Sequence, residues 1–268
     1  MAIKFDEFLA ALRTIAPREL EEDWDNGGMQ IEMSGGEVRK VLVALEITNG
    51  VIDEAIKLGV DYIVSHHPLI FNKIDVIDAD TVTGNYIIRL IKNGISVYSA
   101  HTSFDKVFGG NNDYLADLLG LQRVRRLKVS TALGDEEMVG RLGVFDPPRS
   151  LREIAELVED ALELNAVKVV GDPDTKIEEV GICTGSGGHS IEGVLRNNCD
   201  LYITGDLKYH DAQAAKEMGL CIIDAGHYGT EKTFAENFGE KLKKAMGDKI
   251  EVFKSNINVD PFALCYNK

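Results

Sequence analysis

Two adjacent histidines, His66 and His67, follow an apolar run at 62–64 and precede Pro68. A short apolar run that ends at a turn-forming proline is typical of a buried strand. Neutral imidazole is a common metal ligand, and the end of a strand in an α/β fold lies at the rim of the sheet, where ligands bind. The tandem histidines therefore indicate a metal site.

Two further histidines each precede a carboxylate by four residues, and each pair directly follows a predicted strand. These pairs are His101 with Asp105 and His227 with Glu231. The spacing allows both side chains of a pair to face the same point from one helical turn or tight loop. Because the set holds nitrogen and oxygen ligands and no cysteine, it argues against a purely structural zinc site and suits zinc, iron, manganese or similar ions.

The tandem pair favours two ions over one. Adjacent residues of an extended chain point in opposite directions, so His66 and His67 fit one ion each more readily than one shared ion. Two divalent ions about 3.5–4 Å apart, bridged by a carboxylate, would use this set of ligands. His189, in a glycine-rich segment, gives a weaker indication, and His210 follows a strand from which it could enter the same cleft.

The elements that must position these residues alternate between strand-like and helix-like patterns, and the order occurs twice. Such alternation predicts the α/β class, with two similar α/β domains related by a diverged internal duplication and largely parallel or mixed sheets flanked by helices. The predicted segments are strands 41–47, 61–65 and 95–100 with helices 51–58 and 81–93, then strands 180–183, 200–204 and 220–225 with helices 190–197 and 211–218.

We expect a first domain over residues 1–126 and a second over 127–268. An amphipathic helix is predicted to open the chain, between Phe5 and Ile15. The segment 146–150 is predicted to be a turn, followed by a helix over 151–162 that begins with a capping box of Ser150 and Glu153. The last apolar stretch, around Val252 and 262–266, could return to either sheet.

Composition excludes several functional classes. The 268 residues carry a formal charge of -15, which opposes nonspecific binding to nucleic acid or anionic lipid. No run approaches the roughly 20 apolar residues that span a bilayer, and acidic residues interrupt any N-terminal signal, so we expect a cytoplasmic protein. The basic cluster at 123–128 lacks aromatic residues and is predicted to be a solvated loop. The cysteines are predicted to be reduced core thiols: Cys183, Cys199, Cys221 and Cys265.

Two glycine-containing segments have open roles. The residues from Gly185 to Gly188 follow a predicted strand and would form either a simple turn or an anion-binding loop. Their spacing matches neither a dinucleotide fingerprint nor a P-loop, which favours the turn. The segment from Trp24 to Gly28 is assigned a structural role as a turn.

Taken in order, these motifs resemble the Nif-three-like, YbgI-like proteins, which are often described as type 2 GTP cyclohydrolase I homologues. The resemblance implies a dinuclear metal centre between two α/β domains, in subunits that assemble into a toroidal homohexamer. It runs nearly end to end and rests on Trp24 to Asn26 with Gly28, His66 to Phe71, Ala100 to Thr102 with Phe104 and Asp105, Gly205 and Asp206, and Asp224 to His227 with Glu231.

The same resemblance implies roles for individual residues. His67 and Asp105 would serve one ion, His66 and His227 the other, and Glu231 would bridge the two. His101 would be a nearby acid/base group or would orient a ligand. One departure concerns Gly205–Asp206 and Tyr209–His210, which stand where members of the family often have Gly-Glu and His-His, so the role of 205–211 stays open.

Two functions fit this set of ligands. The first is a metal-dependent hydrolase, similar to GTP cyclohydrolase type 2, in which a metal-bridged hydroxide attacks a nucleotide-like substrate and His101 shuttles a proton. The alternative is a non-catalytic protein: a metal-binding or regulatory hexameric scaffold, or a metal chaperone. The ligands alone are compatible with both.

Overall fold

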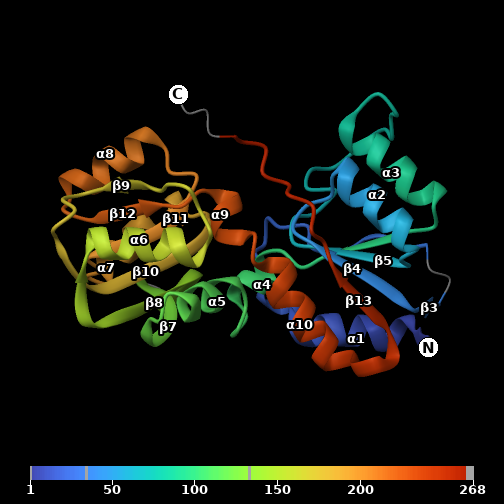
Figure 1. The fold of residues 1–268 in the computed structure, drawn as a ribbon, viewed down its shortest axis with the longest axis horizontal. Helices are drawn as coiled ribbons and strands as arrows, with labels where there is room; N and C mark the ends of the chain where they lie inside the picture. The colour runs from blue at the N-terminus through green and yellow to red at the C-terminus, as the bar shows by residue number, and fades with distance from the viewer. Residues whose placement is uncertain (1, 34–35, 132–133, 264–268) are drawn as a thin grey trace. The chain divides into compact units, whose positions relative to one another are not determined.

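The computed structural model describes residues 2–33, 36–131 and 134–263. The chain divides into two compact units, of which the first holds Met1–Val107 and Phe234–Lys268 and the second holds Phe108–Thr233. Each unit is a sheet with helices on both faces (Figure 1). Within the described ranges, every helix is too short or too polar to cross a membrane.

The first unit is built on a mixed five-stranded sheet in the order β13-β4-β5-β6-β2. β4, β5, β6 and β13 run parallel, and β2 is antiparallel to β6. The elements are β1 (Ile3–Lys4), α1 (Phe5–Ile15), η1 (Arg18–Leu20), β2 (Gly28–Ile31), β3 (Glu37–Val38), β4 (Lys40–Ala44), α2 (Asn49–Leu58), β5 (Tyr62–Ser65), α3 (Val82–Lys92), β6 (Ser96–Ser99), α4 (Thr102–Lys106), α10 (Phe234–Met246), η3 (Gly247–Lys249) and β13 (Glu251–Lys254).

Alternating side chains of this sheet pack against two different pairs of helices. Leu42 and Ile63 belong to a core with apolar residues of α2 and α3. Tyr62, on the opposite face, contacts the ring of Phe8 in α1, with ring centroids 5.0 Å apart. Figure 1 shows α2 and α3 on one side of the strands and α1 and α10 on the other. The near-continuous apolar strands in the sequence follow from this burial on both faces.

The second unit holds a mixed six-stranded sheet in the order β7-β8-β10-β11-β12-β9. β10, β11 and β12 are parallel, whereas β7, β8 and β9 pair antiparallel with their neighbours. The elements are α5 (Asn111–Leu118), β7 (Gln122–Thr131), β8 (Gly134–Ser150), α6 (Leu151–Ala161), β9 (Lys168–Val170), β10 (Lys176–Ser186), η2 (Gly188–Ser190), α7 (Ile191–Arg196), β11 (Leu201–Gly205), α8 (Tyr209–Glu217), β12 (Cys221–Asp224) and α9 (His227–Glu231).

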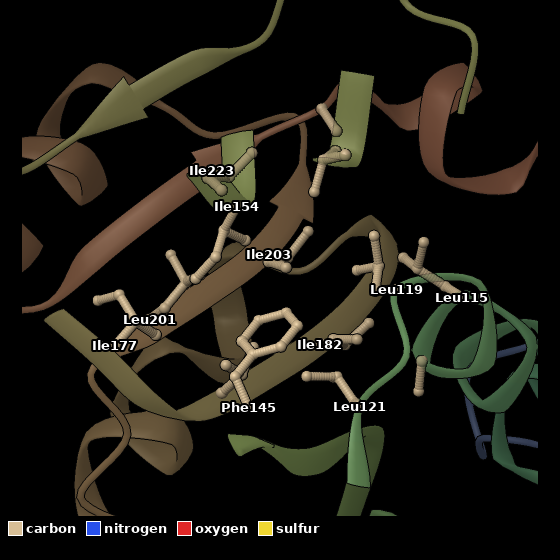
Figure 2. Close-up of a cluster of buried hydrophobic side chains, with 14 of the residues drawn as sticks. Leu115, Leu119, Leu121, Phe145, Ile154, Ile177, Ile182, Leu201, Ile203 and Ile223 are labelled. Atoms are coloured by element: carbon tan, nitrogen blue, oxygen red, sulfur yellow. The ribbon is translucent and has the colours of Figure 1, made fainter. Parts of the chain in front are cut away.

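This sheet also buries both faces. Leu201 and Ile203 of β11 belong to a core that includes α5 and α6, while Tyr202 between them belongs to a second core with α7 and α8. Figure 2 shows the first of these cores, with Ile203 near Ile154 of α6 and Ile182 of β10. The two faces together hold the ends of β10, β11 and β12 in fixed positions.

The two units are similar α/β domains, which confirms the predicted fold class. In the first unit the order is α1, β2, β4, α2, β5, α3, β6, α4, and in the second it is α6, β9, β10, α7, β11, α8, β12, α9. In both, three parallel strands are followed across the sheet by one antiparallel strand. The duplication inferred from the sequence is therefore present in the topology.

The duplicated segment of each unit, its repeat, is followed in the chain by a helix that belongs to the other unit. α5 comes after α4 in the chain yet packs against β8 and β10, and α10 comes after α9 yet packs against α1 and β4. The division therefore falls at Val107/Phe108 and Thr233/Phe234, and a single boundary near residue 127 does not describe it. Apolar periodicity reveals that a helix has a buried face, but it does not reveal which sheet that face covers.

The C-terminal strand returns to the first sheet, because β13, which contains Val252, pairs in parallel with β4. Phe262 is exposed, and 264–266 lie outside the described residues. The capping box is present: Ser150 N donates to Glu153 Oε2 (2.6 Å), and Glu153 N donates to Ser150 Oγ (3.3 Å).

Two local predictions were wrong. The segment 146–150 is not a turn; it belongs to β8, where 145–148 form a bulge opposite Glu178. The basic cluster is not a loop but part of β7, in which Leu127 is buried and Arg126 binds Glu137 and lies over the ring of Phe108. β7 pairs antiparallel with β8, and the end of β8 pairs antiparallel with β10, so each segment has a partner strand that the local sequence does not reveal.

The cysteines lead to a test of the packing. Cys183, Cys199 and Cys221 are buried thiols, and burial raises the pKa of Cys199 to about 12. Because the thiolate is the reactive form, we expect these cysteines to react slowly with a thiol reagent at pH 8 in native protein and rapidly in guanidinium. Cys265 lies outside the described residues, so the measurement uses Cys265→Ser. Native labelling as fast as that of an unfolded control would contradict the packing.

Candidate metal centre

His66 and His67 lie in a bend directly after β5. Their backbone N–H groups donate to the carbonyl oxygens of Ala44 and Leu45, and Ser65 Oγ donates to His67 O at 2.8 Å. The two rings lie 5.1 Å apart and are tilted by 41°. The extended geometry assumed from the sequence thus ends at Ser65, and the bend turns both imidazoles into one region.

His101 joins these two histidines. Ser65 pairs with Ser99 in the parallel sheet, so His67 and His101 both lie two residues beyond aligned positions. The ring of His101 is 5.2 Å from that of His66 and 5.7 Å from that of His67. One ligand atom of each histidine lies within 4.8 Å of the others. The structure therefore brings together three of the residues singled out in the sequence.

Each of these imidazoles uses Nδ1 for a hydrogen bond to an oxygen atom. A carbonyl or an ionised carboxylate only accepts hydrogen bonds, so in each neutral ring Nδ1 carries the proton and Nε2 carries the lone pair. Such partners fix the orientation of metal-binding histidines. The pairs are His66 with Ala100 O (2.8 Å), His67 with Glu46 Oε2 (2.7 Å) and His101 with Asp25 Oδ1 (2.8 Å).

This arrangement fits a divalent cation. Three converging groups offer electron pairs, and Asp105 adds an acceptor, since its Oδ1 lies 3.6 Å from His66 Nε2. Asp105 and His66 are both buried, so little water reaches their polar atoms. A positive ion would complement these acceptors, whereas a neutral His66 has no second proton to donate to Asp105. The His/Asp cluster of the first unit can thus hold a metal ion.

Asp25 is held as a carboxylate beside His101. Burial alone would raise its pKa, but hydrogen bonds from His101 and from Thr102 N and Oγ1 outweigh this effect and lower the pKa from 3.8 to about 2. Because the folded pKa lies below the ordinary value, this carboxylate stabilises the fold above pH 3.8 and loses that contribution as the pH falls towards 2. Asp25 therefore orients His101 throughout the neutral range.

The sequence predicts a structural turn around Asp25 and gives no separate indication for Glu46. Glu46 could have been found, because Ala44, Ser65 and Ser99 are aligned in the sheet and Glu46, His67 and His101 each follow two residues later. Asp25 precedes the edge strand β2 and is not related to these three residues by the alignment of the parallel strands. Only the packed structure shows its contact with His101, across 76 residues of sequence.

Aromatic side chains surround the three imidazoles. Trp24 and Phe71 meet His101 edge to face, with ring centroids 6.1 and 6.2 Å from its ring, and both aromatic residues are exposed. On the buried side, Phe234 packs against His66 with centroids 4.9 Å apart. The cluster therefore has a buried apolar base and an exposed aromatic rim.

The second unit holds its own His/carboxylate cluster at the start of α9. His227 Nδ1 lies 2.7 Å from Asp206 Oδ2, and His227 Nε2 lies 3.1 Å from Glu231 Oε2. A neutral imidazole carries one proton and cannot donate to both carboxylates. The second contact therefore needs either an additional proton, on His227 or on Glu231, or a cation in its place. The sequence leaves the role of Asp206 open, together with the rest of 205–211, whereas in the structure Asp206 is the partner of His227.

The two His-x-x-x-carboxylate pairs are not structurally equivalent. Ser99 and Asp224 end corresponding strands, but His101 lies two residues beyond the first and His227 three beyond the second. His101 precedes α4, whereas His227 begins α9. The structure places Asp105 beside His66. His189 and His210 are exposed and belong to none of the clusters found among the described residues.

Known proteins resemble this chain in sequence and in fold. The model of the family "Duf34/NIF3 (NGG1p interacting factor 3)" matches residues 3–261. A Clostridium acetobutylicum protein named GTP cyclohydrolase 1 type 2 homolog is 34% identical over 98% of this chain and 99% of its own length. The crystal structure of a Bacillus cereus protein related to NIF3 superposes with a TM-score of 0.90, at 25% identity, over 98% of this chain and 99% of that one. The structure of protein ybgI gives a TM-score of 0.82, at 26% identity, over 96% and 99%.

Proposed function

The chain belongs to the Duf34/NIF3 family, and we propose that it binds two divalent metal ions and uses them to hydrolyse a nucleotide-like substrate. The observation that carries the proposal is the convergence of three imidazoles whose Nδ1 atoms are already bound to oxygen, so that the Nε2 atom of each ring is left to coordinate an ion or to accept a proton. The name of the Clostridium acetobutylicum relative, GTP cyclohydrolase 1 type 2 homolog, supports the reaction class.

We assign the ligands as the resemblance in the sequence implied. His67 and Asp105 would hold one ion, His66 and His227 would hold the other, and Glu231 would be a ligand of both. The chemistry of each cluster supports this assignment, since both present imidazole Nε2 atoms beside acidic oxygens. Zinc, iron and manganese all accept such a mixed set.

When bound, two divalent ions lower the pKa of water and stabilise negative charge that develops on the substrate. The chain supplies orientation and proton transfer. Asp25 accepts a hydrogen bond from His101 Nδ1 and so fixes the tautomer of the ring. This leaves His101 Nε2 to take a proton from the attacking water and to return it to the leaving group. Glu46 and Asp206 hold the rings of His67 and His227 in the same manner.

The aromatic rim supports a substrate with a planar ring. Trp24 and Phe71 are exposed next to His101, and exposed aromatic rings stack with nucleobases regardless of the base. A guanine nucleotide combines such a ring with phosphates that divalent ions attract. GTP is therefore the first substrate to test.

The test loads metal-free protein with Zn²⁺, Mn²⁺ or Fe²⁺ and measures turnover of GTP and of simple phosphoesters. We expect wild-type turnover with at least one ion, and its loss in Asp105→Ala and Glu231→Ala. Turnover that both variants leave unchanged would contradict the proposed mechanism. Tight binding of two ions without turnover would instead support the non-catalytic scaffold or metal chaperone.

We also propose that the chain forms a homohexamer, as the resemblance to YbgI-like proteins implies. Light scattering on the purified protein is expected to give six times the chain mass of 29.5 kDa. A mass of one or two chains at micromolar concentration would contradict this assembly.

Asp25→Asn tests the orienting role of Asp25. The amide can donate to Nδ1, so His101 would shift its proton to Nε2 and lose its capacity to accept there. We expect kcat/KM to fall about 10- to 100-fold, while both ions remain bound. Asp23→Asn, an exposed carboxyl in the same segment, is the matched control. Equal activity of the two variants would show that Asp25 does not orient a working base.

A further inference from the structure

Residues 185–188, where β10 ends and a turn follows, form a loop that lies against the His/carboxylate cluster of the second unit. Gly185 has a φ of +71°, and a methyl group built on its Cα would overlap Glu231 Oε1. The same methyl would lie 3.1 Å from Glu231 Cδ and 3.3 Å from His227 Nε2. Glu231 therefore occupies space that is open only because residue 185 has no side chain.

The loop is held firmly in this place. Gly185 N donates to Thr230 Oγ1 at 2.9 Å, and Gly187 N donates to Thr204 Oγ1 at 3.0 Å. Tyr202 OH donates to Gly187 O at 2.8 Å, and burial raises the pKa of Tyr202, which keeps the hydroxyl protonated. These bonds use two of the amides that an anion-binding loop would need, which favours the turn over the phosphate site.

Thr230 joins the loop to the helix that carries the ligands. Its hydroxyl accepts from Gly185 N and lies 3.0 Å from the carbonyl oxygens of Gly226 and His227, in the residues where α9 begins. Thr230 precedes Glu231 directly in this helix. The loop is thus connected through the Thr230 hydroxyl to the backbone that starts the helix, and it lies against the carboxylate that ends the helix.

We propose that Gly185 is a positioning residue for metal binding: its bare Cα leaves room for the Glu231 carboxylate to turn towards the ions, and any side chain at this position displaces that carboxylate. The proposal rests on the proposed function, since it concerns a ligand of the same centre. The carboxylate ends a flexible side chain, so it would move away from an added methyl before the fold yields. Gly185→Ala should consequently lose metal affinity more than stability.

The experiment measures Zn²⁺ binding to the metal-free full-length protein by calorimetry with a competing chelator, and folding by circular dichroism. Gly185→Ala is expected to bind one of the two ions about 10- to 100-fold more weakly. Gly219→Ala is the matched control, because Gly219 has a φ of +78° in the same unit and nothing within 4 Å of an added methyl. Gly219→Ala should show a similar fall in melting temperature but should keep the wild-type affinity for both ions.

Two further variants keep the test decisive. Glu231→Gln combined with Gly185→Ala should bind no more weakly than Glu231→Gln alone, because both changes act on the same carboxylate. Thr230→Val, which removes the acceptor of Gly185 N without adding an atom beside Glu231, should also weaken binding, and it replaces Gly185→Ala if that variant does not fold. Wild-type affinity in Gly185→Ala, or in Thr230→Val where it takes that place, would overturn the proposal. Failure of the wild type to bind Zn²⁺ would refute the proposed function itself.

Discussion

Replacing His66 with alanine is expected to abolish binding of one metal ion and, with it, hydrolytic activity. His66 is fully buried, its Nδ1 is bound to Ala100 O, and its Nε2 lies 3.6 Å from Asp105 Oδ1. Loss of a residue that merely orients a ligand weakens a metal site about 10- to 100-fold, so loss of the ligand itself should cost at least about 100-fold. Elemental analysis after dialysis would give the ion count per chain.

His210→Ala is the control for this experiment, because His210 is exposed on α8 and outside the His/carboxylate clusters of the described chain. We expect it to retain both ions. An unchanged ion count in His66→Ala would remove His66 from the ligand set. Equal loss of ions in the two variants would show that ions were lost during handling of the protein and not because a ligand was removed.

Phe234→Ala is expected to destabilise the protein by about 3–5 kcal/mol, the range found for the loss of a buried phenylalanine. Phe234 is fully buried at the start of α10, and its ring packs against Phe104 (5.4 Å), Phe238 (5.2 Å) and His66 (4.9 Å). The cavity would loosen the packing of the His66 ring, so metal binding should weaken as well. Urea unfolding of the metal-free protein measures the first effect without the second.

Phe262→Ala removes the same side chain from an exposed position and should change the free energy of unfolding by less than about 0.5 kcal/mol. A cost below about 1 kcal/mol for Phe234→Ala would mean that α10 does not fix His66 as the structure indicates. If both variants were strongly destabilised, the exposure of Phe262 would be in error.

The alternation of the elements could be read from the sequence because it has a local cause. Strands buried on both faces need continuous apolar runs, and helices that cover them need apolar residues at helical spacing. The parallel strands β4, β5 and β6 and their counterparts β10, β11 and β12 were found in this way, as was the duplication that relates them. The hairpin β7–β8 was missed because its residues alternate less regularly and contain a bulge.

The sequence by itself determined which side chains are available for chemistry and that they follow strand ends: His66, His67 and His101 in one repeat, His227 and Glu231 in the other. Only the tertiary structure decided their partners. Asp25, Glu46 and Asp206 reach the imidazoles from distant segments, and α5 and α10 each pack in the unit opposite to the repeat that they follow. The spacing of buried residues is a property of neighbouring positions in the chain, so it can be recognised in the sequence. Hydrogen-bond partners and the placement of helices depend instead on which surfaces meet after folding.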